Sequence, residues 1–301
     1  MTHKNSYNKW TEAELNSIVC DVPRIDWLTA TTFDQVHFMS IRDEWMRWTV
    51  RSMTGGKSEQ AKRRQYKGVE IGGVFFGIAE QNGVDHFMVV ASGGLAHHFA
   101  TIMRTWLAAM KVTRIDVQYT TSLMGSWELN GDAEQMHRLS PATTTTTYVK
   151  RSAKGKYQTL YIGSRQSDKM VRVYQKDGVV DGGGEVKLGR WEIEFTGDLA
   201  PNVYSSVFAD PENAAKVMGG ILSTSYDKLE GRFGRLTFMG TFAPMLRYDN
   251  YKLRVVGKPS RTVEWLYEAV LPAIKSLCAE GSSEQALVWL SNVAKVVGDV
   301  E

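Results

Sequence analysis

The chain has 301 residues, of which 43% are hydrophobic and 11% aromatic, enough apolar material for a substantial core. Its 36 basic and 33 acidic side chains leave a net charge of +3, which permits an anionic partner without requiring one. Two cysteines exclude a disulfide framework and a thiolate metal centre, and a polar start with no long apolar run predicts neither a signal peptide nor a transmembrane helix. We therefore expect a cytoplasmic protein in a reducing compartment.

The first half of the chain is predicted to mix strands and helices. Residues 1–22 are polar and are expected to form a separate N-terminal segment. An alternating strand is expected at 25–32, and a helix over 33–53 follows. Its apolar residues recur at three- and four-residue steps: Val36, Met39, Trp45 and Trp48. Next come a polar, basic connector at 54–68, two strands within 69–94 joined by an Asn-Gly turn, a helix over 95–110 and a strand over 112–120.

The second half is predicted to contain a three-stranded meander and further helices. A threonine-rich, basic stretch at 140–156 is expected to be an exposed connector or an edge strand. The meander strands are 158–165, 170–178 and 190–195, and the helices are 211–222, 261–280 and 284–297. No linker is apparent, so we expect one α+β domain over 23–280, with a central antiparallel sheet flanked by helices, and a C-terminal helix in 281–301.

Acidic residues recur on one face of two predicted strands. Asp116 shares its face with Arg114 and Gln118, and Glu192 shares its face with Glu194. If these faces adjoin, three carboxylates meet, and such oxygen ligands suit Mg²⁺ or Mn²⁺. The alternative is that these residues are the solvent face of a half-exposed sheet, which produces the same alternation.

The stretch MVRVYQKDG, residues 170–178, places Arg172, Tyr174 and Lys176 on one strand face. Flanking cations would favour tyrosinate and hold a phosphate, as a nucleophilic tyrosine needs at neutral pH. The alternative is packing, because tyrosine is a favoured strand residue. A basic cluster at 62–68 either contacts a DNA backbone or forms a solvated loop.

The block TLYIGSRQSDKMVRVYQKDG, followed by RWEIEF, resembles the replication initiation factor family of rolling-circle initiators and related conjugative relaxases. The positions that match the family pattern are Tyr161, Gly163, Ser164, Arg165, Ser167, Arg172, Tyr174, Lys176, Arg190, Glu192 and Glu194. IDWLTATT, VVASGGLAHHF, VTRIDVQYT and TVEWLYEAVLPAI also match in family order, so the resemblance covers about residues 25–275. Many members carry a second aspartate soon after the RID strand, where this chain reads Val117-Gln118-Tyr119.

The resemblance implies a nicking-initiator-like fold and a nicking and closing endonuclease. A tyrosine attacks a DNA phosphodiester, giving a 5′-phosphotyrosine link and a free 3′-hydroxyl, and the reverse reaction rejoins the strand. The implied roles are nucleophile for Tyr174, DNA binding for Arg165, Arg172, Lys176 and Arg114, and Mg²⁺ or Mn²⁺ binding for Asp116, Glu192 and Glu194.

The same resemblance implies particular partners. These are origin DNA as a single strand or extruded nick site, a host helicase and polymerase, and a second copy of the chain, with no membrane. Two other classes of function compete with it: a sequence-specific DNA-binding protein that does not cut, and a transesterase that acts on RNA.

Overall fold

The computed structural model describes residues 8–10, 22–52, 58–81, 83–122, 129–139, 146–150, 158–164, 167–180 and 185–248. The chain divides into two compact units, Met1–Arg254 and Val255–Glu301, and every described residue belongs to the first. The helices predicted at 261–280 and 284–297, and the boundary predicted at 280, lie outside the described residues. None of the helices among the described residues is both long and apolar enough to cross a membrane.

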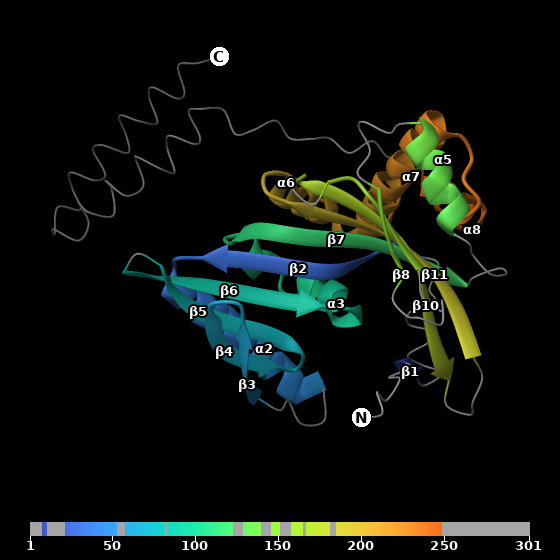
Figure 1. The fold of residues 1–301 in the computed structure, drawn as a ribbon. Coiled ribbons are helices and arrows are strands. Elements are labelled where there is room, and N and C mark those ends of the chain that lie inside the picture. Colours follow the sequence, from blue (N-terminus) through green and yellow to red (C-terminus); the bar gives the residue numbers. More distant parts are fainter. Residues whose placement is uncertain are drawn as a thin grey trace, which may run out of the picture. The chain divides into compact units, whose positions relative to one another are not determined.

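A sheet of eleven strands is the frame of the described part of the chain (Figure 1). The strands are β1 Asn8–Trp10, β2 Arg24–Thr32, β3 Ser58–Arg63, β4 Tyr66–Ile71, β5 Val74–Gln81, β6 Val84–Ser92, β7 Lys111–Ser122, β8 Thr146–Lys150, β9 Gln158–Ile162, β10 Lys169–Val180 and β11 Glu185–Thr196. Their order is β3-β4-β5-β6-β2-β7-β11-β10-β9-β8, with antiparallel pairing throughout, and β1 pairs in parallel with the end of β10. The predicted central antiparallel sheet is confirmed.

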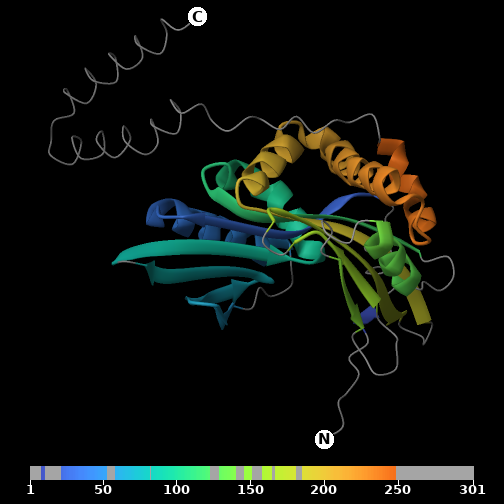
Figure 2. The same ribbon diagram turned by 45° about the horizontal axis from the view of Figure 1, so that its top comes forward.

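The described helices pack on one face of this sheet (Figure 2). They are α2 Gln35–Ser52, α3 Gly94–Ile102, α4 Arg104–Leu107, α5 Leu129–Leu139, α6 Leu199–Phe208, α7 Ala214–Phe233 and α8 Met239–Phe242, with 3₁₀ turns η1 Pro211–Asn213 and η2 Ala243–Tyr248. Helices α2 and α3 contact the β2, β4 and β6 region, and α6 and α7 contact β7 and β11. The opposite face, called the open face below, carries the candidate site.

Strand alternation decides which side chains reach the open face. In β11 the buried side chains Trp191, Ile193 and Phe195 face the helices, where Trp191 packs against Tyr226 and Phe242. The alternate residues of β11, and the matching residues of β7, point the other way. The polar faces predicted for these two strands are therefore both on the open face and adjoin, because β7 and β11 are direct neighbours.

Several predicted elements differ from the observed ones in the N-terminal half. The connector predicted at 54–68 is wrong, because β3 and the start of β4 lie there. The first of the two strands predicted within 69–94 is split at Gly72 and Gly73, whose positive φ angles of 52° and 79° make a turn between β4 and β5. Of the apolar residues predicted for the core side of α2, Trp45 is buried and Met39 and Trp48 pack against the core, but Val36 is 78% exposed. Phe38 and Ile41 complete the buried side.

The remaining differences concern helices and the sheet edge. The helix predicted over 95–110 is interrupted at Met103 and forms α3 and α4. Helices α5 and α6 were not predicted. Within the stretch 140–156, the edge-strand alternative is confirmed for β8, which is the last strand of the sheet. The predicted strand 112–120, the meander and the helix that begins near 211 are all confirmed.

A buried aspartate ties α5 to the loop that supports the back of β11. Asp132 is 1% exposed and accepts hydrogen bonds from the backbone N–H and hydroxyl of Thr237, at 2.7 and 2.6 Å, and from the N–H of Phe238. Phe238 in turn packs against Trp191, with ring centroids 5.6 Å apart.

We expect Asp132→Ala to lower the free energy of unfolding by about 3 kcal/mol, because it leaves these donors without their charged acceptor. Urea unfolding followed by tryptophan fluorescence measures the change. Glu134→Ala, an exposed change on the same helix, is the matched control. Equal midpoints for the two variants would contradict the role of Asp132.

Candidate active site

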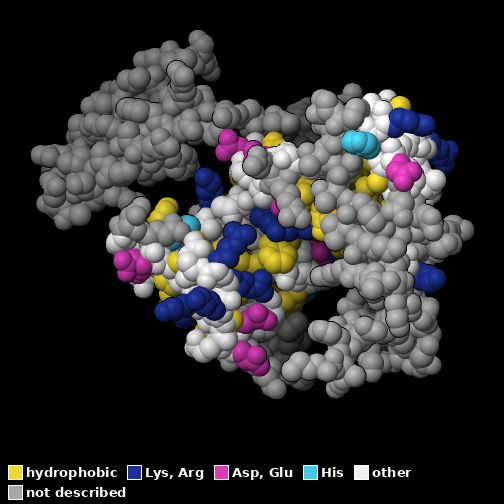
Figure 3. Space-filling model, in the orientation of Figure 1, with side chains coloured by type: hydrophobic (Ala, Val, Ile, Leu, Met, Phe, Trp, Pro, Cys, Tyr) yellow, Lys and Arg dark blue, Asp and Glu magenta, His cyan; other side chains and the backbone are white. Residues whose placement is uncertain are grey.

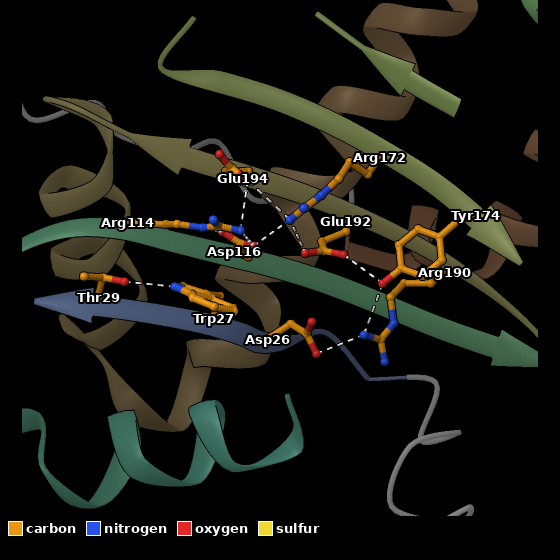
Figure 4. A network of polar contacts seen from close by, with 10 residues as sticks. All are labelled: Asp26, Trp27, Thr29, Arg114, Asp116, Arg172, Tyr174, Arg190, Glu192 and Glu194. Atoms are coloured by element: carbon orange, nitrogen blue, oxygen red, sulfur yellow. Dashed lines mark hydrogen bonds and ion pairs between the residues drawn. The ribbon is translucent and has the colours of Figure 1, made fainter. Parts of the chain in front are cut away.

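Polar side chains from four adjacent strands meet on the open face (Figure 4). The pairing register brings them together: Glu194 of β11 lies opposite Asp116 of β7, and Glu192 lies opposite Arg172 of β10. One step further along, Tyr174 of β10 lies opposite Arg190 of β11, and strand β2 adds Asp26 from the other side of β7. The site therefore depends on long-range strand pairing rather than on one contiguous motif.

The three predicted carboxylates come together, with two arginines between them. The Arg172 Nη2 donates to Asp116 Oδ2 at 2.6 Å and to Glu192 Oε1 at 2.5 Å. The same nitrogen lies 3.4 Å from Glu194 Oε2. The Arg114 guanidinium donates through Nε and Nη2 to both oxygens of Asp116, at 2.8 and 2.6 Å, and its Nη2 lies 2.9 Å from Glu194.

Burial makes this pairing necessary. Asp116 is 1% exposed and Glu192 is 4% exposed, and an isolated buried carboxylate would be strongly destabilising. Burial raises the pKa of Glu192, while the guanidinium of Arg172 acts in the opposite direction and Asp116 adds to the increase. Glu192 is thus a carboxylate with more affinity for a proton than an ordinary glutamate.

The Tyr174 hydroxyl lies beside this cluster. It donates to Glu192 Oε2 at 3.0 Å, and it accepts from Arg190 Nη1 at 3.4 Å. Burial raises the pKa of Tyr174 well above its usual range; Arg190 lowers it, and Glu192 and Asp26 raise it further. The resting side chain is therefore the neutral phenol, in contrast to the tyrosinate expected from the flanking cations.

Arg190 contacts the tyrosine and carries a fixed set of further hydrogen bonds. It is 4% exposed, donates through Nε to Thr120 Oγ1 at 2.9 Å, and donates through Nη1 to Asp26 Oδ1 at 3.0 Å. Burial alone would lower the pKa of Arg190, but Tyr174, Asp26 and Glu192 together raise it above its usual value. The guanidinium is thus a fixed positive charge aimed at the phenol oxygen.

The other predicted DNA-binding cations have distinct positions. Arg172 shares the strand face of Tyr174, but its contacts are with the carboxylates. Lys176 also lies on that face, and burial lowers its pKa to about 8, with Arg190 lowering it and Asp26 and Glu192 opposing the change. Arg165 lies outside the described residues.

The carboxylate cluster reaches the surface through a pocket. Its lining residues are Tyr161, Ser167, Met170, Arg172 and Glu194. Arg172 and Glu194 belong to both the pocket and the cluster, and each keeps about a fifth of its side chain exposed, 19% and 20%. A phosphate group could therefore approach the guanidinium of Arg172 from this side.

Asp26 and Arg190 were not among the predicted site residues. Strand alternation could have identified Arg190, because it shares a face with Glu192 and Glu194 and belongs to the family pattern. Asp26 could not be placed in this way. The pairing of β2 with β7 is irregular between Ile25 and Trp27, and this bulge brings Asp26 and Trp27 to the open face in succession.

The carboxylates have the ligand chemistry of a Mg²⁺ or Mn²⁺ site, but in this arrangement the guanidiniums occupy them. Among the described residues, no group of three or more His, Cys, Asp or Glu side chains is arranged to hold a metal ion. A divalent ion at this cluster would require Arg172 to withdraw. The buried Nε of Arg172 has no hydrogen-bond partner, and the hydrogen bonds to Asp116 and Glu192 are both made by Nη2.

Comparison with known proteins gives a family and several distant structural likenesses, among them the following two. No curated protein matches the chain. A rolling circle replication initiator protein from Geobacillus stearothermophilus is 18% identical, with a TM-score of 0.48 over 78% of this chain and 98% of that one. DynU16, a protein of the dynemicin biosynthetic locus, is 10% identical, with a TM-score of 0.16 over 74% of this chain and 94% of that one. At TM-scores below 0.5, neither likeness identifies the fold.

The family match is more extensive. The model of the family described as replication initiation factor matches residues 110–278, which is more than half of the chain. The match includes β7, β9, β10 and β11, and with them Asp116, Tyr174, Arg190 and Glu192. The chain belongs to the replication initiation factor family, and its role is in the initiation of replication.

Proposed function

We propose that the protein nicks one strand of origin DNA with Tyr174 as the nucleophile. The observation that supports this assignment is the position of the Tyr174 hydroxyl, which is hydrogen-bonded to the buried Glu192 and faces the buried Arg190. The product is a 5′-phosphotyrosine link and a free 3′-hydroxyl. Family membership supports this outcome, because a free 3′-hydroxyl is what a polymerase needs to begin synthesis.

The phenol must lose its proton during the attack, because tyrosinate is not the resting form. Glu192 accepts that proton, since its Oε2 already receives the hydrogen bond and burial raises its pKa. As this proton leaves, the Tyr174 oxygen forms a bond to phosphorus and the bond from phosphorus to the 3′ oxygen breaks. Proton loss and bond formation occur together, so free tyrosinate never accumulates in the buried site.

The arginines stabilise the negative charge that develops during this transfer. Arg190 lies beside the phenol oxygen and is already oriented by Asp26 and Thr120, so it needs no rearrangement to meet the charge. Arg172 lines the pocket through which a phosphate can approach and has a fork suited to two phosphate oxygens. Binding a phosphate there would draw Arg172 away from the carboxylates.

Lys176 supplies the proton that the leaving 3′ oxygen needs. It shares a strand face with Tyr174, and the charges of Arg190, Asp26 and Glu192 all act on it. With a pKa of about 8, its ammonium group is present at neutral pH and gives up its proton more readily than an ordinary lysine. Glu192, the base, thus takes one proton from the Tyr174 oxygen, and Lys176, the acid, gives one proton to the leaving 3′ oxygen.

Peptide mapping of a covalent adduct tests the assignment. The protein is incubated with single-stranded DNA containing the nick site of its origin, digested with protease and nuclease, and analysed by mass spectrometry. The expected result is a nucleotide attached to the peptide that contains Tyr174. A protein that binds its origin without cutting gives no adduct, and an adduct on any other tyrosine would overturn the assignment of the nucleophile.

Divalent metal binding is a separate proposal, because in this structure Arg114 and Arg172 form ion pairs with the carboxylates that would hold the metal. Mg²⁺ or Mn²⁺ held by Asp116, Glu192 and Glu194 would polarise the scissile phosphate. Arg172→Met removes the competing charge and keeps the side-chain length, so we expect it to tighten Mn²⁺ binding about tenfold.

Electron paramagnetic resonance of free Mn²⁺ measures this affinity without any cleavage assay. Arg42→Met is the matched control, because Arg42 pairs with Asp43 on α2, in the helical layer on the other face of the sheet. Equal Mn²⁺ affinities for wild type and Arg172→Met would mean that these carboxylates do not bind the metal.

A further inference from the structure

Trp27 and two arginines form a stack on the open face, beside the carboxylate cluster. The Arg114 Cζ lies 4.6 Å from the centroid of the Trp27 ring, and the Arg63 Cζ lies 5.8 Å from it. The Trp27 Nε1 donates to Thr29 Oγ1 at 2.9 Å, which fixes the orientation of the indole on the strand (Figure 4). The ring is only partly buried.

The neighbouring strands build a flat apolar floor for this stack. Gly68 of β4 lies opposite Gly77 of β5, and a Cβ on Gly77 would lie 2.5 Å from the ring of Phe75. The missing side chain of Gly77 lets Phe75 lie close to the sheet, and that of Gly68 allows the close approach of the β5 backbone. Arg63 covers Phe75 as well, with its Cζ 5.5 Å from that ring. The rest of the floor consists of Tyr66, Ala79, Met88 and Val90.

The cationic side chains of this region do not all point toward the open face. Arg63 and Lys62 are adjacent on β3, so their side chains point to opposite faces of the sheet. Arg63 lies over the aromatic rings and also pairs with Glu70 at 3.6 Å, while Lys62 is exposed on the other side. Figure 3 shows Lys and Arg side chains gathered around an apolar patch on the face it presents.

We propose that the stack of Trp27, Arg63 and Arg114 binds single-stranded DNA by base stacking, next to the nick site. An indole and guanidinium planes are the groups on which unpaired bases stack, and the guanidinium charges also attract the backbone phosphates. Arg114 links the stack to the reaction, because the same guanidinium contacts Asp116 and Glu194. The open face would thus hold the strand on one side of the scissile phosphate.

The strand geometry indicates how far the stacked bases lie from the nick. Trp27 and Tyr174 are three strands apart and two open-face positions apart along the strands, which is roughly 20 Å between their Cα atoms. Stacked nucleotides rise about 3.4 Å each, so the bases concerned lie within about six nucleotides of the scissile phosphate. Only this placement rests on the proposed function; the binding itself does not.

The experiment separates base stacking from charge and from cleavage. Fluorescence anisotropy measures binding of a fluorescein-labelled oligothymidylate of about 20 nucleotides, and of an abasic oligonucleotide with the same number of phosphates. The protein carries Tyr174→Phe, so no cleavage occurs. We expect Trp27→Leu to weaken binding of the oligothymidylate about tenfold and to leave the abasic strand within about twofold, whereas Trp27→Phe keeps most of the affinity.

Arg63 and Lys62 provide the matched pair for the charge contribution. We expect Arg63→Ala to weaken oligothymidylate binding and to reduce the slope of log affinity against log salt by about 0.7, the value for one phosphate contact on a single strand. Lys62→Ala, on the opposite face, should leave both quantities nearly unchanged. Thermal unfolding of each variant confirms that it is folded.

Two results would overturn the proposal. One is the absence of oligothymidylate binding by the Tyr174→Phe protein. The other is a folded Trp27→Leu variant that binds oligothymidylate as well as its parent, or that loses the abasic strand to the same extent. The adduct-mapping experiment tests the nicking assignment separately. An adduct on another tyrosine, or no adduct at all, would refute that assignment without changing the interpretation of these binding measurements.

Discussion

Replacing Tyr174 by phenylalanine is expected to abolish both nicking and the covalent adduct, and to leave DNA binding within a few-fold of wild type. The change removes only the hydroxyl, which is the atom that would attack phosphorus, and keeps the ring that packs on β10. The free energy of unfolding should fall by about 1.5–3 kcal/mol, the value of one hydrogen bond to a charged group. Glu192 keeps its ion pair with Arg172, so no buried charge is left unpaired.

The measurements are gel assays of cleavage and adduct formation, combined with anisotropy and urea unfolding on the same protein samples. Tyr161→Phe is the matched control, because Tyr161 lies on the adjacent strand β9, opposite Arg172, and lines the pocket. It should retain the adduct. If Tyr174→Phe forms the adduct and Tyr161→Phe does not, the roles of the two tyrosines are reversed.

The parts of the site that could be predicted from the sequence are those that depend on strand alternation. A period of two places Asp116, Glu192 and Glu194 on defined faces, and it does so wherever the strand is correctly identified. The strand that contains Tyr174 was identified for the same reason. These three strands are also neighbours in the sheet, in the order β7-β11-β10, so faces that were predicted separately form one surface.

What could not be predicted depends on contacts across strands and on irregular backbone. Alternation gives the face of Arg172 but not its partners, which belong to two other strands and lie 56 and 20 residues away in the sequence. Arg172 does share the strand face of Tyr174, but the cation hydrogen-bonded to the phenol oxygen is Arg190, which the prediction did not include. The bulge in β2 likewise changes the face of Trp27, and no local sequence signal distinguishes it from a regular strand.

The metal hypothesis also depended on contacts that the sequence does not reveal, namely which cation neutralises the three carboxylates. Three carboxylates on adjoining faces indicate a cation, and a cation is present, but the structure supplies it from Arg114 and Arg172. A sequence pattern of alternating acids and bases is compatible with both arrangements, because it does not reveal which side chains meet. Only the pairing register, which places Arg172 opposite Glu192, distinguishes them.

Lys176→Ala is expected to slow nicking by about 10³-fold, because it removes the proton donor for the leaving 3′ oxygen. The pKa of Lys176 determines whether the cleavage rate rises or falls with pH. The ammonium form donates, and with a pKa of about 8 it is present below that pH and lost above it. Wild-type cleavage should therefore decline as the pH rises through about 8, and Lys176→Ala should lack that decline. Lys176→Arg keeps the charge but not an ionisation in this range, so it should bind DNA normally and cleave slowly.

A substrate with sulfur in place of the bridging 3′ oxygen separates acid catalysis from charge. A thiolate leaves without a proton, because the pKa of a thiol is near 8.5 and far below that of an alcohol. We expect this substrate to restore cleavage by Lys176→Ala and Lys176→Arg to within about tenfold of wild type, while Tyr174→Phe stays inactive on it. If sulfur does not restore Lys176→Ala, and Lys176→Arg already cleaves the ordinary substrate at nearly the wild-type rate, Lys176 acts through its positive charge on the scissile phosphate, and the proton for the 3′ oxygen comes from another group.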